Sequence, residues 1–323
     1  MNRQMLNVGI IGCGRMGKIR AEATRLAQHN LLAAFDTDNQ ILADFKILFS
    51  SCKTINEIEN FPWNDIDVVF ICSPPCWHYA HLSDALKNNK PFLVEKPFST
   101  NAIGGAGLVH ELHSKGIINV VGYMNRYRPS VQYVKNFSFL GVSSYWINKM
   151  YQVPWWANIE ESGGPLNEQA THLLDLNRYI LGEVDDVFAN CSSGNYNFPT
   201  TISINLKFGG GQVGNILYSC DANSKNIGMD LFTSEDKLCL TGWDFNLLNQ
   251  GSVPFPLLTA QDVFNIETKT FFEAVIENNQ QLILSDLSDA IKTQLLADAV
   301  NSSIRTGKAV NVKNFAAAAL ECT

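Results

Sequence analysis

The feature that most constrains the fold is a short apolar strand that runs directly into a glycine turn, at residues 7–17 with the sequence NVGIIGCGRMG. In a unit of this kind Gly12 makes the tight turn, Gly14 lets backbone N–H groups approach a pyrophosphate, and Gly17 lets the following helix lie close to the strand. The N-terminus of that helix offers unpaired N–H groups and a positive dipole to phosphates. The stretch predicts a dinucleotide-binding unit, although glycines at this spacing also occur in turns of other α/β proteins.

Apolar runs and helical patterns alternate through the first third of the chain. Buried strands are expected at residues 31–35, 66–72, 91–94 and 118–121, with helical periodicity between them. Strands that alternate with helices at this spacing predict a doubly wound parallel sheet of the Rossmann type, with ligands at the carboxyl ends of the strands. We therefore expect residues 1–122 to form a dinucleotide-binding Rossmann domain.

An acidic residue, Asp36, ends the second predicted strand about 20 residues after the glycine turn, where a carboxylate can accept hydrogen bonds from adenosine ribose hydroxyls. The next residues, Thr37, Asp38 and Asn39, include no arginine or lysine to receive a 2′-phosphate. The pattern favours NAD over NADP. Without this context, Asp36 would be interpreted as a helix cap or a turn residue.

The pattern changes after Gly122. Strands are expected at residues 145–150, 187–191, 201–208, 213–219, 229–233 and 237–241, with hairpin turns at 209–211 and 234–236, and helices at about 168–181, 262–278 and 286–306. We expect residues 123–323 to form an α+β domain for substrate binding and oligomerisation, with a large open, mostly antiparallel sheet and a C-terminal helix able to pack back on the first domain. Helices on one side leave the other face to be buried, which favours a homodimer or homotetramer through this sheet.

Composition excludes some classes of partner. The 323 residues carry a formal net charge of −7 without a basic block, which disfavours nucleic acid and membrane surfaces and favours a small-molecule ligand. The sequence enters its first strand at once and has no apolar run long enough to span a bilayer, so we expect a cytoplasmic protein. Its eight cysteines form no CxxC pair and lie mostly in apolar runs, as reduced, buried cysteines do. No metal-ligand cluster is evident, and no metal is expected.

Several ordered motifs make the chain resemble the glucose-fructose oxidoreductase and inositol dehydrogenase family (Gfo/Idh/MocA) over nearly its whole length. They are GCGRMG at 12–17, Asp36, PxxxH at 74–78, EKP at 95–97, NRYRP at 125–129 and SGGPLNEQATHLLDL at 162–176. The resemblance implies a Rossmann domain followed by an α/β domain with an open sheet, NAD or NADP as cofactor, and oxidation or reduction of a sugar, inositol or related hydroxyl compound.

Carried over by position, the resemblance implies that Lys96 reaches the reacting hydroxyl and the nicotinamide ribose, and that His172 is the acid/base histidine. Without its position at the end of a strand, Lys96 would be interpreted as a surface lysine paired with Glu95. Glu168, His172 and Asp175 are spaced so that they share one face of a helix. Outside the family pattern, such a cluster is more typical of a solvated, salt-bridged face or a capped core histidine.

The chain departs from the common family pattern DxGxHxxD, because Glu168 replaces the Asp and Ala170 replaces the Gly. The longer carboxylate would reach a different hydroxyl, which leaves the identity of the substrate open. Asp175 is interpreted with equal weight as orienting His172 or as binding substrate.

The expected contacts form two sets. Cofactor contacts are expected from the glycine turn and the strand ends, namely Gly12, Cys13, Gly14, Arg15, Met16, Gly17, Asp36, Ser73, Pro74, His78, Glu95, Lys96 and Asn125. Substrate contacts are expected from Lys96, Arg126, Trp155, Trp156, Glu168, His172 and Asp175, with Tyr123 nearby. For the two tryptophans, core packing explains the sequence nearly as well.

The favoured function is hydride transfer between the nicotinamide of NAD and a carbinol carbon of a sugar or polyol, with His172 taking the hydroxyl proton and Lys96 polarising the same oxygen. Two alternatives stay open. One is a glycoside-cleaving enzyme that uses bound NAD transiently without net redox change. The other is a non-catalytic NAD-dependent sensor or regulatory protein, against which the presence of both Lys96 and His172 argues.

Overall fold

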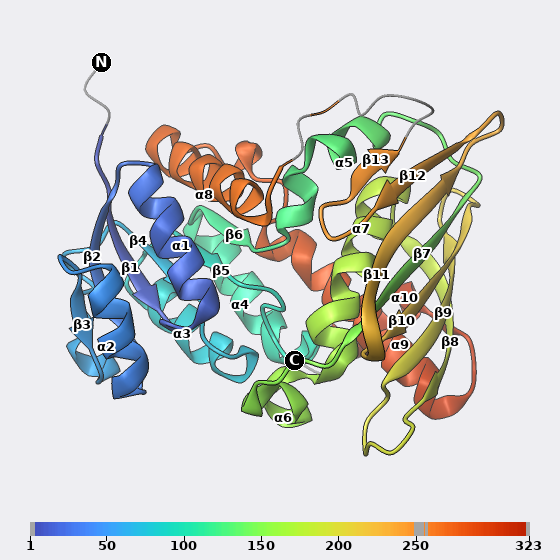
Figure 1. Ribbon diagram of the computed structural model, residues 1–323, viewed down its shortest axis with the longest axis horizontal. Helices are drawn as coiled ribbons and strands as arrows, with labels where there is room; N and C mark the ends of the chain where they lie inside the picture. Colours follow the sequence, from blue (N-terminus) through green and yellow to red (C-terminus); the bar gives the residue numbers. More distant parts are fainter. Residues whose placement is uncertain (1–3, 249–254, 256–257, 321–323) are drawn as a thin grey trace. The chain divides into compact units, whose positions relative to one another are not determined.

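The chain divides into two compact units, each built around its own sheet (Figure 1). The computed structural model describes residues 4–248, 255 and 258–320. The first unit contains the described residues up to Ser99 together with Gly107–Met124 and Gln261–Ser288. The second contains Thr100–Ala106, Asn125–Ala260 and the residues from Asp289 onward.

The sheet of the first unit has six parallel strands in the order β3-β2-β1-β4-β5-β6, which is the order of a Rossmann fold. The residues of β4, β5 and β6 are all buried, as in a sheet covered by helices on both faces. The predicted doubly wound parallel sheet is confirmed. The elements are β1 (Asn7–Ile11), α1 (Arg15–Leu26), β2 (Asn30–Phe35), α2 (Asn39–Leu48), β3 (Lys53–Ile55), η1 (Ile58–Asn60), β4 (Val68–Ile71), α3 (Pro75–Lys87), β5 (Phe92–Val94), α4 (Ala102–Lys115), β6 (Asn119–Val121), α8 (Ala260–Glu277) and η5 (Gln280–Leu282).

Local sequence explains where two helices of this unit begin. The Asp38 carboxylate caps α2 by accepting hydrogen bonds from the backbone N–H groups of Gln40 and Ile41. Helix α3 begins with Pro75, earlier than the predicted start at residue 77, because a proline fits the first helical position, where its missing N–H is not needed.

Helix α8 packs on the same face of the first sheet as α1 (Figure 1). Phe271 and Phe272 join the apolar core of β1, β4 and β5, with ring centroids 5.7 Å from that of Phe70. From the sequence, this segment is expected in the second domain, with the C-terminal helix able to pack back on the first. The helix that returns is α8, because its phenylalanines find apolar partners on the first sheet. The boundary between residues 122 and 123 stays a prediction.

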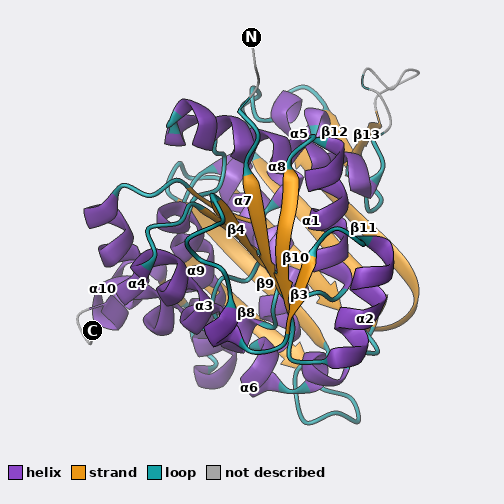
Figure 2. Cartoon of the chain, turned by 90° about the vertical axis from the view of Figure 1, so that its left-hand side faces the viewer, coloured by secondary structure: helices purple, strands orange, loops and turns teal. Residues whose placement is uncertain are grey.

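The second unit contains an eight-stranded sheet in the order β13-β12-β11-β7-β10-β9-β8-β14. All its strand pairs are antiparallel except β7 with β10, so the predicted large, mostly antiparallel sheet is confirmed. Strand β11 is 12 residues long, and Figure 2 colours the strands orange and labels β8, β9, β10 and β11 among them. The elements are η2 (Met124–Tyr127), α5 (Pro129–Val134), β7 (Gly141–Lys149), η3 (Pro154–Ala157), α6 (Ile159–Ser162), η4 (Leu166–Ala170), α7 (Thr171–Leu181), β8 (Val184–Ser192), β9 (Thr201–Phe208), β10 (Val213–Ser219), β11 (Asp221–Phe232), β12 (Lys237–Thr241), β13 (Asn246–Leu248), α9 (Leu287–Thr306), β14 (Val310–Asn311) and α10 (Val312–Leu320).

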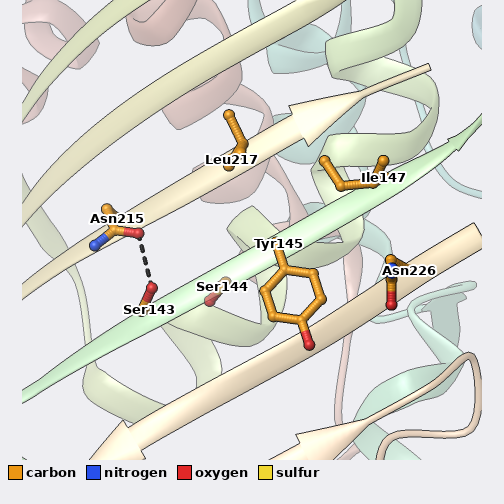
Figure 3. A pocket seen from close by; sticks show the side chains of 7 residues that line it. All are labelled: Ser143, Ser144, Tyr145, Ile147, Asn215, Leu217 and Asn226. Carbon is orange, nitrogen blue, oxygen red and sulfur yellow. Dashed lines mark hydrogen bonds between the residues drawn. The ribbon is translucent and has the colours of Figure 1, made fainter. Parts of the chain in front are cut away.

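The two faces of this second sheet differ in burial. Along β9, buried and exposed residues alternate, so one face carries the core and the other carries exposed side chains. On the exposed face, residues of β7, β10 and β11 line an open hollow that includes Tyr145, Leu217 and Asn226 (Figure 3). The opposite face packs against α7 and α9 through the apolar core of the unit.

Candidate active site

The carboxyl ends of the strands of the first sheet lie level with one another. Strand register pairs Ile11 with Phe35 and Ile71, and Val94 with Ile71 and Val121. Backbone hydrogen bonds continue past the strands: N–H groups donate from Gly12 to the carbonyl of Phe35 (2.8 Å), from Cys72 to Ile11 (2.7 Å), from Glu95 to Ile71 (2.9 Å) and from Gly122 to Val94 (2.8 Å). The glycine turn, Asp36, the segment at Ser73 and Pro74, and the Glu95–Lys96 pair therefore share one edge of the sheet.

The three glycines of the turn differ in the space available for a Cβ atom. Gly12 has a φ of +94°, and a Cβ there would lie 2.6 Å from the carbonyl carbon of Cys72. A Cβ at Gly17 would lie 2.0 Å from the carbonyl oxygen of Gly12. At Gly14, which precedes α1, no atom lies within 4 Å of the Cβ position. Packing therefore requires Gly12 and Gly17, whereas Gly14 leaves space at a helix N-terminus of the kind that binds a pyrophosphate.

Asp36 braces the glycine turn while it stays partly exposed at the tip of β2. Its Oδ2 accepts a hydrogen bond from the backbone N–H of Cys13 (2.8 Å), and its Oδ1 accepts one from Asp38 (3.0 Å). The Cys13 side chain is buried, and burial raises the pKa of its thiol. Arg15 is exposed and Met16 is half-buried in the first turn of α1.

His78 is 1% exposed and bridges two strand ends. Its Nδ1 lies 2.8 Å from the carbonyl oxygen of Pro97, and its Nε2 lies 2.7 Å from that of Ser73. Burial lowers the pKa of His78 to about 4, although the two carbonyls oppose this shift. The Ser73 hydroxyl is also engaged, 2.9 Å from Nδ1 of His81. Both ring nitrogens of His78 thus contact backbone, so its observed contacts hold the segment beside Lys96 and include no exposed nitrogen for a cofactor.

Glu95 is paired with Arg20 of α1. The Nε of Arg20 donates to Oε1 of Glu95 (2.8 Å), and its NH2 group lies 2.5 Å from Glu267 of α8. Arg20 is 0% exposed and Glu95 is 6% exposed. The observed partner of Glu95 is thus Arg20, and Lys96 is half-buried at the sheet edge. The role of Lys96 stays a prediction.

In the second unit, Glu168 and His172 lie on two consecutive helical segments. Residues Leu166–Ala170 form a π-helix, η4, and α7 begins at Thr171, where a single helix from residue 168 was predicted. Single π turns of this kind are frequent at functional sites. Glu168 and His172 are each 6% exposed, and the His172 ring stacks on Trp146 of β7.

Asp175 and Arg126 pair with each other. Two nitrogens of Arg126 donate to the Asp175 carboxylate at 2.9 and 2.5 Å, and the Thr293 hydroxyl donates to it at 3.1 Å. Asp289 contacts both Arg126 and Arg178. Burial raises the pKa of Asp175 despite Arg126, whereas for Asp289 the two arginines outweigh burial and lower the pKa. The Asp175 carboxylate is part of this network, and among the described residues no hydrogen bond or ion pair joins it to His172.

The remaining predicted contacts lie in packed surroundings. Trp156 is 1% exposed and makes edge contacts with Tyr151 and Phe198, while Trp155 is half-buried against the same core. The amide oxygen of Asn125 accepts a hydrogen bond from Arg128 (2.8 Å). Tyr123 is 1% exposed at the end of β6. Roles for these residues in ligand binding stay predictions.

Sequence reasoning missed Arg20, Arg178, Asp289 and Trp146. The position of Arg20 could have indicated its role. It lies one turn after Gly17 on the side of α1 that packs against the sheet, where a charged residue needs a buried partner. The other residues depend on contacts between elements far apart in sequence, for which we find no local signal.

The described part of the chain has neither a metal-binding cluster nor a membrane-spanning helix. Within it no group of three His, Cys, Asp or Glu side chains is placed to hold a metal ion. None of the helices described there combines the length and apolar character needed to cross a membrane. Seven of the cysteines form no disulfide with one another, and Cys322 lies outside the described residues.

Comparison with known proteins identifies both halves of the chain. Residues 6–123 match the family model described as "Oxidoreductase family, NAD-binding Rossmann fold", and residues 137–239 match the GFO/IDH/MocA C-terminal domain. The uncharacterized oxidoreductase YrbE of Bacillus subtilis is 27% identical over 199 residues, and the myo-inositol 2-dehydrogenase of Thermotoga maritima is 27% identical over 201 residues. Each match covers 58% of this chain and 58% of the relative, so the matched segment spans little more than half the length of these relatives.

A similar solved structure is that of a levoglucosan dehydrogenase in complex with NADH and levoglucosan. It superposes with a TM-score of 0.84 at 21% identity, over 96% of this chain and 100% of that one. At this level of identity the likeness is one of fold.

Proposed function

The chain belongs to the Gfo/Idh/MocA oxidoreductase family, whose N-terminal domain is an NAD-binding Rossmann fold, and we propose that it transfers a hydride between NAD and a hydroxyl-bearing carbon of a sugar, inositol or sugar derivative. The observation that carries this proposal is the shared sheet edge, where the glycine turn, Asp36 and Lys96 lie at neighbouring strand ends.

The residues of that edge fit a dinucleotide. The space beside Gly14 would accept the pyrophosphate, and Asp36 would accept hydrogen bonds from the adenosine ribose. The negative charge of Asp36 would repel a 2′-phosphate, which supports NAD over NADP. Bound NAD supplies the hydride-accepting nicotinamide ring.

The chain would supply the proton transfers. His172 would take the proton of the substrate hydroxyl during oxidation and return it during reduction, while the ammonium of Lys96 would donate a hydrogen bond to the same oxygen. Arg20 and His78 support this role of Lys96, because they hold the residues on either side of it, Glu95 and Pro97, by buried hydrogen bonds.

The names of the relatives support a polyol or sugar as substrate. They include a myo-inositol 2-dehydrogenase and a UDP-N-acetylglucosamine 3-dehydrogenase. Glu168 would bind a further hydroxyl of the substrate, since its carboxylate precedes His172 by one helical turn.

The test is a panel of inositols, aldoses, amino sugars and nucleotide sugars, each with NAD and with NADP, followed by NADH or NADPH absorbance. We expect NADH formation with at least one compound, and we expect Lys96→Met and His172→Ala to lose most turnover while NAD affinity, measured by calorimetry, changes little. Full activity in either variant would overturn the assignment of these roles. Glycoside cleavage without added NAD or net NADH would favour the redox-neutral alternative, and NAD binding without any turnover would favour a sensor.

We also propose that the protein is cytoplasmic and forms a homodimer or homotetramer through the exposed face of its second sheet. That face presents partly exposed apolar side chains, among them Leu217 (44% exposed) and Val213 (61% exposed), beside the hollow of Figure 3. Sedimentation equilibrium tests the assembly: Leu217→Lys should shift the protein toward monomer, and a wild-type monomer would refute the proposal.

A further inference from the structure

The ring of His172 lies flat against the indole of Trp146. The ring centroids are 5.4 Å apart and the planes are inclined by only 8°. Trp146 is 1% exposed and His172 is 6% exposed, so the pair is shielded from bulk water. Neither the family motifs nor the sequence pattern assigns a role to Trp146.

The backbone places Trp146 toward α7. Along β7 the buried residues Val142, Ser144 and Trp146 point to the covered face of the sheet, while Ser143 and Tyr145 line the hollow on the opposite face. A second contact joins the same two elements, because the Asn177 side chain of α7 donates to the Ser144 hydroxyl (3.1 Å).

The two contacts between β7 and α7 have matching spacings. Ser144 and Trp146 are about 6.6 Å apart along a strand, and Asn177 and His172 are about 7.5 Å apart along a helix. The strand and the helix therefore meet at two points, which fixes the position of His172 along the sheet.

A second aromatic ring also packs against the indole. Trp243 meets Trp146 edge to face, with centroids 5.3 Å apart and planes at 77°, and the ammonium of Lys225 lies 3.9 Å from the centroid of Trp243. Tyr218 of β10 is the register neighbour of Trp146 and donates its hydroxyl hydrogen to Gln169 (2.6 Å). Trp146 thus has little freedom to rotate, and it transmits that restriction to the histidine ring.

Titratable groups on the surrounding elements do not replace the effect of the indole. Burial raises the pKa of Tyr218, so its hydroxyl is neutral at physiological pH. The Asp175 carboxylate is engaged by Arg126, and Lys225 lies against Trp243. Glu168 is the acidic neighbour of His172 along the chain, and it is present in every variant used below.

We propose that Trp146 is a positioning residue for His172, whose ring face sets the plane of the imidazole and favours its protonated form. This inference rests on the proposed function, in which His172 becomes an imidazolium when it takes the hydroxyl proton. An aromatic face attracts a cation through its quadrupole, and the attraction strengthens where water is excluded. Trp146 would thus assist proton transfer in two ways, by orienting the imidazole that accepts the proton and by stabilising its charged form.

The experiment follows the His172 ring directly. NMR titration of the histidine rings in the full-length protein, with the His172 signal assigned from His172→Gln, is compared between wild type, Trp146→Leu and Trp146→Phe. Phe208→Leu is the matched control, because Phe208 is 1% exposed in the same core and makes no ring contact with His172 among the described residues. Thermal unfolding shows which variants are folded.

We expect the titration midpoint of His172 to move to lower pH by about 0.5 to 1 unit in Trp146→Leu, and by less in Trp146→Phe, which keeps a smaller ring face. Phe208→Leu should leave the midpoint unchanged. In the oxidation reaction, the acid limb of the kcat profile should move with the midpoint, and kcat should fall about tenfold while KM changes little. If Trp146→Leu does not fold, Trp146→Phe decides the question.

An unchanged midpoint in a folded Trp146 variant, or a shift to higher pH as expected from simple water entry, overturns the inference. The two proposals can fail separately. A midpoint shift in a protein that turns over no hydroxyl compound refutes the proposed function alone, whereas normal turnover with an unshifted midpoint refutes the role of Trp146 alone.

Discussion

Replacing Arg20 with methionine is expected to lower the free energy of unfolding of the first unit by about 3–5 kcal/mol. The guanidinium is 0% exposed and lies 2.7 Å from Glu95 and 2.5 Å from Glu267. It also donates to the Thr268 hydroxyl (3.0 Å) and lies 5.0 Å from the centroid of the Phe264 ring. Methionine would keep much of the volume, so the loss would come mainly from two buried carboxylates left without a counter-charge.

A control on the same helix separates this effect from any loss of an arginine. Arg25 pairs with Glu22 at 2.6 Å, but the side chains are 65% and 35% exposed. We expect Arg25→Met to change stability by less than about 1 kcal/mol, because water and salt screen an exposed pair. Urea unfolding at pH 7, followed by circular dichroism, gives both values by linear extrapolation.

The second carboxylate supplies a further check. In the double variant Arg20→Met, Glu267→Gln, one of the two uncompensated charges is gone, so part of the lost stability should return. The reasoning would be refuted by an Arg20→Met protein whose free energy of unfolding lies within about 1 kcal/mol of wild type, because removing one partner of a buried ion pair should destabilise the fold by more than that.

Three further outcomes are expected from the first unit. Stability should fall as the pH is lowered from 6.5 to about 4, by up to about 3 kcal/mol for His81, because burial lowers its pKa to about 4 and the unfolded chain then binds more protons. His81→Gln should flatten this decline in a pH series of urea titrations. Gly17→Ala should destabilise the fold in thermal unfolding, because its Cβ would overlap the carbonyl oxygen of Gly12. Gly14→Ala should keep the free energy of unfolding within about 1 kcal/mol of wild type but weaken NAD binding, as measured by calorimetry. Asp36→Asn should raise the kcat/KM for NADP relative to NAD by about tenfold, and an unchanged ratio would mean that the charge of Asp36 does not select the cofactor.

The parts of the fold that could be predicted from sequence are those with strong local patterns. The strands at Thr201–Phe208, Val213–Ser219 and Lys237–Thr241 were predicted with their observed bounds, because alternation and turn residues define them. Strand β11 begins at Asp221 rather than at residue 229, since its first half is polar and is held by register with β7. The short strands β3, β13 and β14 carry too few residues for a pattern.

In the candidate site, too, some positions follow from local sequence and others depend on contacts between distant residues. The positions of Asp36 and Lys96 follow from strand ends, which sequence can locate, and the strand register places them at one edge. The partner of Glu95 could not be predicted, because Arg20 lies 75 residues away and local sequence offers only the alternative of a pair with the adjacent Lys96. The π turn before His172 also has no sequence signal, since its residues are ordinary helix formers.

The buried network of the second unit bears on which side chains recognise the substrate. Arg126 and Asp175 were expected to contact it, but each already satisfies the other by two charge-assisted hydrogen bonds at 3% and 1% exposure. If a substrate hydroxyl replaced either partner, the other would be left as a buried charge without a counter-charge. The free-energy cost of that unpaired charge exceeds the stabilisation from one neutral hydrogen bond. The observed contact of these two residues joins η2 to α7, and their contact with substrate stays a prediction. Under the proposed function, Lys96, Glu168 and His172 remain the polar groups expected to contact the substrate, and a change of specificity should be sought first at Glu168.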